Sequence, residues 1–120
     1  MKFMHVTISV KNLDESVAFY RDVAGLPVAR RYAAGPDTEI AFLGDGETQV
    51  ELIYNKNAPE IAIGQDISIG FATDSVEGLL AELRAGGVPV ISDIISPNPH
   101  VAFFFVSDPN GVKVQFLESK

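Results

Sequence analysis

The sequence predicts an α+β fold in which one β-α-β-β-β unit occurs twice within a single domain, residues 1–120. The two clearest signs are similar strands, QVELIY at residues 49–54 and KVQFLE at residues 113–118. Upstream of each lie an alternating strand, an acid-led helix and a Gly-hydrophobe-Pro-Val sequence, at residues 25–28 and 87–90. A long motif present twice indicates a duplicated unit, because solenoids generally need three or more copies.

The first module is expected over residues 1–58. Apolar and polar residues alternate along residues 3–10, which predicts a strand. Asn12 or Asp14 can cap the following helix, and Gly25 can end it. Three more strands are expected between glycine-containing turns, at residues 26–34, 38–43 and 47–54.

The second module is expected over residues 66–118, after a linker at residues 55–65 that has no clear period. Its first strand is predicted at residues 66–73 and its helix at residues 75–85, stopped by Gly86 and Gly87. The remaining predicted strands span residues 88–91, 101–106 and 112–117. Residues 92–99, rich in Pro and Ser, predict a loop, and the Asp-Pro-Asn-Gly sequence at residues 108–111 predicts a hairpin turn.

The composition is that of an acidic globular chain without cysteine. Hydrophobic residues make up 47% and charged residues 21%, which lies outside the disordered range. The net charge of −7 argues against nucleic acid or an anionic membrane as a partner. The absence of cysteine excludes disulfides and thiolate chemistry. No signal-peptide pattern or long apolar run is present, so a cytoplasmic protein is expected.

Polar residues gather on one face of four predicted strands. Because Val6 and Ile8 face the helices, their neighbours in the first strand project to the opposite side. The same alternation assigns a shared polar lining to that side: His5, Thr7, Ser9, Gln49, Glu51, Asp66, Ser68 and Gln115. One imidazole, two carboxylates and an amide oxygen suit a divalent ion such as Zn, Ni, Mn or Fe. The alternative is a solvated sheet face without a function, which is common in antiparallel sheets.

The alternation also orients the aromatic residues of the second module. It directs Phe104 toward the pocket side, alongside Ala102, and His100 is expected to line the pocket mouth. The fifth strand is expected to bury its apolar residues, Ile67, Ile69 and Phe71.

Several segments together resemble the vicinal oxygen chelate superfamily: HVTISV at residues 5–10, SVAFYRD at 16–22, VELIYN at 50–55, DPNG at 108–111 and QFLE at 115–118. Within it, the chain is most similar to glyoxalase I, the lactoylglutathione lyase family, over essentially its whole length. The resemblance implies paired modules that form a U-shaped, half-open barrel, often in a homodimer, with a small-molecule substrate. It also implies metal ligands on the first, fourth, fifth and eighth strands.

Carried over by position, the metal ligands would be His5, Glu51, Asp66 and Gln115. Asp66 stands where a histidine is usual, and Gln115 where a glutamate is usual. The resemblance implies Zn or Ni, with Mn, Co or Fe as alternatives. In this family's chemistry the metal polarises an enediolate while a carboxylate moves a proton between adjacent carbons. Glu51 is the first candidate for this catalytic base, and Asp66 the second by symmetry.

The resemblance also suggests how substrate would be recognised. Glyoxalase I commonly has an arginine four residues after the first ligand, to pair with a glutathione carboxylate, and this chain has Ser9. Asn55 matches a glutathione-contacting asparagine. We therefore expect weak glutathione recognition and a substrate-binding set that comprises Thr7, Ser9, Asn55, Ser68, His100 and Phe104.

The leading hypothesis is a metal-dependent lyase or isomerase that acts by proton transfer on an α-hydroxycarbonyl or thiohemiacetal. The alternatives are an acyl-thioester epimerase and a metal-free protein that binds a small molecule such as an antibiotic. Ring-cleaving dioxygenase chemistry fits less well, because it needs two histidines and a carboxylate. A homodimer is expected, because each small sheet would otherwise leave an open edge.

Overall fold

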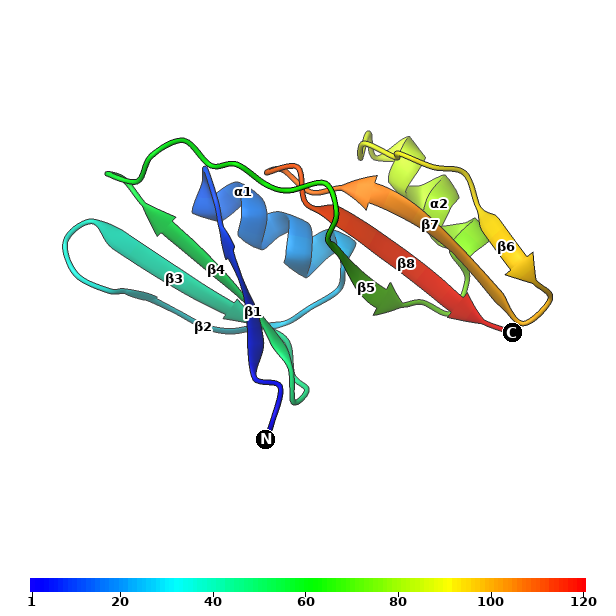
Figure 1. The fold of residues 1–120 in the computed structure, drawn as a ribbon, viewed down its shortest axis with the longest axis horizontal. Helices are drawn as coiled ribbons and strands as arrows, with labels where there is room; N and C mark the ends of the chain where they lie inside the picture. The colour runs from blue at the N-terminus through cyan, green and yellow to red at the C-terminus, as the bar shows by residue number, and fades with distance from the viewer. The chain divides into compact units, whose positions relative to one another are not determined.

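The computed structural model describes residues 1–120, which divide into two compact units, Met1–Ala62 and Ile63–Lys120. Each unit has one four-stranded sheet with a helix packed against one face (Figure 1). Neither sheet closes on itself. No helix has the length and hydropathy needed to cross a bilayer.

The first unit follows the order β-α-β-β-β. Its elements are β1 (His5–Ser9), α1 (Leu13–Ala18), the π-helical turn η1 (Phe19–Val23), β2 (Val28–Ala33), β3 (Thr38–Leu43) and β4 (Gln49–Asn55). The strand order is β1-β4-β3-β2; β1 and β4 are parallel and the other pairs antiparallel. The Asn12 side chain accepts a hydrogen bond from the Glu15 backbone N–H (2.9 Å) and so caps α1.

The second unit repeats this topology. Its elements are β5 (Ser68–Ala72), α2 (Val76–Ala85), β6 (Ile95–Asn98), β7 (Val101–Ser107) and β8 (Lys113–Ser119). The strand order is β5-β8-β7-β6, again with one parallel pair, β5 and β8. Gly25 and Gly87 follow the helices at equivalent places, with φ of +74° and +76°. This conformation favours glycine, which explains why both copies of the Gly-hydrophobe-Pro-Val sequence begin with that residue.

Each core lies between the sheet and its helix. The largest fully buried side chains in the first unit are Tyr20, Leu43 and Leu52. Their counterparts in the second unit include Phe104, Val76, Val106 and Val114. The predicted hairpin turn is present: the Asp108 carboxylate accepts hydrogen bonds from the backbone N–H groups of Asn110 (2.8 Å) and Val112 (2.7 Å).

The structure differs from the expected strands at the edge of the second sheet. A strand was expected at residues 88–91, but β6 lies at Ile95–Asn98, inside the predicted loop. Residues 89–91 still meet β7, through the Val90–Val106 bridge and the hydrogen bond from the Ile91 N–H to the Phe105 carbonyl (2.9 Å). The edge is therefore interrupted. The prolines of residues 92–99 predict a loop, but an edge strand tolerates proline because its outer N–H groups need no partner.

The fifth strand also begins later than expected. The predicted strand started at Asp66, whereas β5 starts at Ser68. The prediction that Ile67 is buried is wrong, since 73% of this residue is exposed. Ile69 and Phe71 are half-buried. The apolar run thus extends beyond the region where β5 pairs with β8.

Candidate active site

A row of four side chains crosses the first sheet on the face opposite α1. Thr7 on β1 is in register with Glu51 on β4, Glu51 with Phe42 on β3, and Phe42 with Arg30 on β2. Residues that are direct partners in a sheet project from the same face. We call Thr7, Glu51, Phe42 and Arg30 the first row.

Glu51 is the most restrained carboxylate of this face. The Thr7 hydroxyl donates a hydrogen bond of 2.5 Å to Glu51 Oε1. His5 Nε2 lies 3.5 Å from the same oxygen. The Glu51 side chain is only 14% exposed, against 37% for His5. Neither contact involves Oε2, so the second carboxylate oxygen remains available to a ligand.

Phe42 and Arg30 complete the site and were missed from the sequence. The Phe42 ring meets the His5 imidazole edge to face, with centroids 5.6 Å apart. The Arg30 guanidinium carbon lies 3.9 Å from the centre of the Phe42 ring. The register of the β3–β4 hairpin would have revealed Phe42, which it pairs with Glu51. The register of β2 with β3, which pairs Arg30 with Phe42, would have revealed Arg30.

The second unit carries an equivalent row with different chemistry. Gly70 on β5 is in register with Gln115 on β8, and Gln115 with Phe105 on β7. A Cβ atom added to Gly70 would lie 3.1 Å from Gln115 Oε1. The glycine therefore leaves room for the amide. We call Gly70, Gln115 and Phe105 the second row.

The register corrects the position expected for Asp66. In the first unit His5 pairs with Gln49 and Thr7 with Glu51; in the second, Ser68 pairs with Lys113 and Gly70 with Gln115. Ser68 is therefore the equivalent of His5, with an offset of 68 − 5 = 63. Asp66 is exposed and lies two residues before β5, because the strand begins only where pairing with β8 begins.

The predicted orientation of Phe104 is wrong. Phe104 is fully buried with Phe116 in the core of the second unit, their ring centroids 5.6 Å apart. Its neighbour Phe105 is in register with Gln115 and takes the place expected for Phe104. Three consecutive phenylalanines are apolar on both faces, so the sequence alone did not fix which one faces the core.

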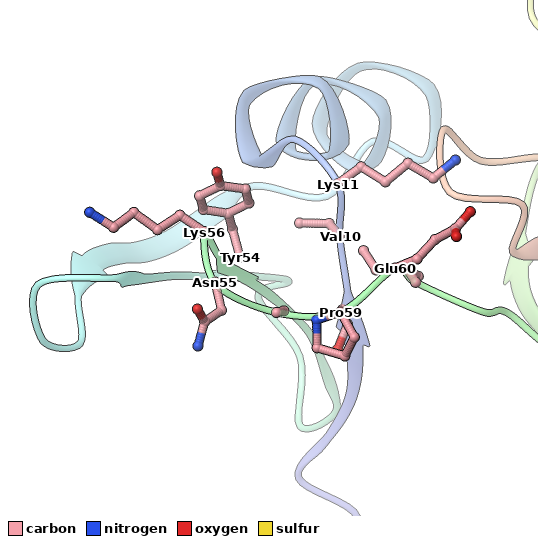
Figure 2. Close-up of a pocket in the computed structure, with 10 residues that line it drawn as sticks. Val10, Lys11, Tyr54, Asn55, Lys56, Pro59 and Glu60 are labelled. Atoms are coloured by element: carbon pink, nitrogen blue, oxygen red, sulfur yellow. The ribbon is translucent and has the colours of Figure 1, made fainter.

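Ser9 and Asn55 lie together at one end of the first sheet. They line a groove of about 440 Å³ that also includes Lys11, Tyr54 and Glu60. Figure 2 shows the Tyr54 and Asn55 side chains on opposite sides of the chain, with Lys11 and Glu60 at the other end of the groove. Asn55 Oδ1 accepts a hydrogen bond of 2.9 Å from the Asn57 N–H.

The expected ligands are divided between the two units. His5 and Glu51 meet in the first unit, while Gln115 and Asp66 belong to the second, as do Ser68 and the exposed His100. No group of three or more His, Cys, Asp or Glu side chains is arranged to hold a metal ion. The His5–Glu51 pair fits as two ligands of one ion, since N and O donors about 2.1 Å from a tetrahedral ion lie roughly 3.4 Å apart.

The chain is similar in sequence and in fold to known proteins. The family model described as Glyoxalase/Bleomycin resistance protein/Dioxygenase superfamily matches residues 2–116. The chain belongs to this superfamily. This confirms the family expected from the sequence. The two sheets, each with a helix on one face, confirm the expected α+β fold class.

Proteins similar to this chain include enzymes named lactoylglutathione lyase or glyoxalase I. The lactoylglutathione lyase of Haemophilus influenzae is 32% identical over the whole chain and 94% of its own length. That of Neisseria meningitidis is 30% identical, over the whole chain and 92% of its own length. The structure of the trypanothione-dependent glyoxalase I of Leishmania major is 28% identical, with a TM-score of 0.83, over 98% of this chain and 86% of that one.

Proposed function

We propose that the protein is a glyoxalase I-like lyase that isomerises a thiohemiacetal or related α-hydroxycarbonyl by proton transfer. The observation that supports this most directly is Glu51, a mostly buried carboxylate held by Thr7 and adjacent to His5. A positioned carboxylate is the group that such a reaction needs. The relatives named lactoylglutathione lyase support the same reaction class.

We propose that a divalent ion, Zn or Ni with Mn, Co or Fe as alternatives, binds to His5 and Glu51. Gln115 and Asp66 also stay proposed metal ligands. When bound, such an ion supplies a Lewis acid for the carbonyl oxygen of the substrate. The donor set of one nitrogen and several oxygens is compatible with these ions.

The proton transfer is assigned to Glu51. Because Thr7 and His5 both contact Oε1, Oε2 is the atom proposed to take the proton from the carbon that bears the hydroxyl group. Returning this proton to the neighbouring carbon, while the hydroxyl proton passes to the oxygen on that carbon, converts a thiohemiacetal into the thioester of a hydroxy acid. The reaction is an isomerisation and needs no co-reactant. Asp66 remains the second candidate base.

We propose a thiol other than glutathione. Ser9 provides no cation at the position where glyoxalase I commonly has an arginine, so a glutathione carboxylate would lose a charge-assisted hydrogen bond. The similar glyoxalase I of Leishmania major is trypanothione-dependent, so it uses a thiol other than glutathione. Thr7, Ser9, Asn55, Ser68 and His100 stay in the proposed substrate-binding set, and Phe105 replaces Phe104.

A metal-free binding protein is the second candidate, and one observation favours it. The second unit presents Ser68 and Gln115, a hydroxyl and an amide, at the positions equivalent to His5 and Glu51. Neutral groups are weaker metal ligands than imidazole and carboxylate. Such a protein would bind a small molecule without reacting with it.

Metal analysis and turnover separate these two candidates. The purified chain would be titrated with Zn, Ni, Mn and Co in a calorimeter and assayed with methylglyoxal adducts of several thiols. We expect one ion per site and turnover that depends on it. Absence of binding at saturating concentrations of all four ions, with no turnover, would favour the binding protein.

We also propose that the protein forms a homodimer. The strand β1 forms one edge of the first sheet, and two exposed apolar side chains, Phe3 and Met4, precede it at the edge away from β2. Exposed strand edges and apolar patches commonly mark protein interfaces. A monomer in light scattering at micromolar concentration would contradict this proposal.

A further inference from the structure

Arg30 is the one arginine of the chain without a carboxylate partner. Arg21 pairs with Asp22 (2.8 Å) and Arg84 with Asp93 (2.6 Å). Arg31 binds both Asp14 (2.7 Å) and Glu39 (2.9 Å), and these hydrogen bonds raise its pKa. The contact of Arg30 is instead the face of the Phe42 ring, at 3.9 Å.

The contact with the Phe42 ring does not use the hydrogen-bond donors of Arg30. A guanidinium is attracted to an aromatic ring by its charge, and its N–H groups can still bind a carboxylate. Arg30 is exposed, so these donors are accessible. An arginine whose charge no acidic side chain of the protein neutralises can pair with a carboxylate from solution.

The position of Arg30 relates it to the proposed base. Arg30 is in register with Phe42, and Phe42 with Glu51, so the three lie on adjacent strands of the first row. Neighbouring strands are about 4.8 Å apart, which puts β2 roughly 10 Å from β4. Because the Arg30 side chain reaches back over Phe42, its guanidinium lies about 5–10 Å from the Glu51 strand.

We propose that Arg30 binds a carboxylate of the substrate and thereby selects for anionic adducts. This inference rests on the proposed function. The preferred substrate would be a compact thiohemiacetal with a carboxylate about 5–10 Å from the reacting carbon. The planar guanidinium can bind both carboxylate oxygens at once. The positive charge that binds the substrate would therefore come from Arg30 on β2, and not from the position of Ser9 on β1.

Two matched thiols test the charge preference. N-acetylcysteine carries a carboxylate, and N-acetylcysteine amide replaces it with a neutral group of similar shape. We expect the wild-type chain to prefer the carboxylate adduct of methylglyoxal by about tenfold or more in kcat/KM, mainly through KM. Arg30→Gln should abolish this preference, and Arg30→Lys should keep part of it. Arg84→Gln removes the same charge from α2 and should leave the preference intact.

Binding of unreactive analogues separates this inference from the proposed function. The S-acetonyl thioethers of both thiols would be titrated into wild type and Arg30→Gln by calorimetry. Carboxylate-selective binding that Arg30→Gln abolishes, without turnover of any adduct, supports the inference and rejects the lyase. A preference that survives Arg30→Gln overturns the inference, whether or not turnover occurs.

Two further outcomes would overturn the inference that Arg30 binds the substrate carboxylate. If neither thioether binds and no adduct reacts, both the inference and the lyase are overturned. If Arg30→Gln changes the oligomeric state in light scattering but leaves the preference unchanged, Arg30 serves a contact between copies of the chain, and the inference is wrong.

Discussion

The two units share a scaffold but differ in the chemistry of their equivalent rows. The first row combines Thr7, Glu51 and Phe42, where the second has Gly70, Gln115 and Phe105. The aromatic residue is retained at the same register position, whereas the ionisable group and its hydrogen-bond donor occur only in the first row. Duplication thus conserves the shape of the sheet, and the acid–base chemistry is concentrated in the first unit.

The largest expected effect comes from removing the carboxylate that distinguishes the two rows. Glu51→Gln makes the first row resemble the second and should lower turnover about 10²–10⁴-fold, since positioned acid–base groups contribute this much. Much of the metal affinity should remain, because the amide oxygen can still bind. Steady-state kinetics and calorimetry measure both quantities. The control is Glu47→Gln, an exposed residue of the turn before β4; a loss below tenfold in Glu51→Gln would contradict the assignment.

The reverse change makes the second unit more like the first. Ser68→His introduces an imidazole at the position equivalent to His5, so affinity for Zn should rise about tenfold or more, given the preference of Zn for imidazole. Ser68→Ala is the matched control and should change little. Calorimetric titration with Zn gives the affinities. If Asp66→Asn instead weakens Zn binding while Ser68→His has no effect, Asp66 supplies the ligand from its bend before β5.

Local patterns predicted the parts of the fold that depend on short-range interactions. The alternation in β4 correctly placed Val50 and Leu52 in the core, and the Asp108 turn and the Asn12 cap formed as expected. Cross-strand register depends instead on how a whole hairpin closes, so Phe42 and Arg30 were missed. The predictions of where β5 starts and which way Phe104 points were wrong for a related reason. Consecutive apolar residues are compatible with more than one strand start and with either face, and packing and strand pairing decide between them.

The Thr7 hydroxyl offers a finer test of the first row. Thr7→Val keeps the side-chain shape but removes the hydrogen bond to Glu51 Oε1. We expect kcat to fall about tenfold, as is typical when a residue that orients a ligand is lost. Thr7→Ser should restore most of the activity. Thr48→Val removes another hydroxyl bond of the first unit, to the Phe3 carbonyl (2.8 Å), and should have little effect on kcat; equal losses in both valine variants would point to general destabilisation.

The smallest expected effect concerns how each sheet holds its helix. In the second unit the Glu118 carboxylate accepts a hydrogen bond of 2.8 Å from the Val76 N–H, at the first residue of α2. Its counterpart in the first unit is Tyr54, by the offset 115 − 51 = 64 of the two rows. There the first turn of α1 is held by the Asp14–Arg31 ion pair instead.

Glu118→Ala should therefore destabilise the protein by about 1 kcal/mol, because it removes a hydrogen bond and a negative charge from the N-terminus of α2. For a chain of this size, this corresponds to a decrease in Tm of roughly 4 °C. Thermal unfolding followed by circular dichroism measures the change, with Glu82→Ala on the exposed face of α2 as the control. Equal Tm values for the two variants would mean that packing of Val76, Leu80 and Leu83 alone holds α2 on its sheet, and that the carboxylate of β8 adds nothing to this attachment.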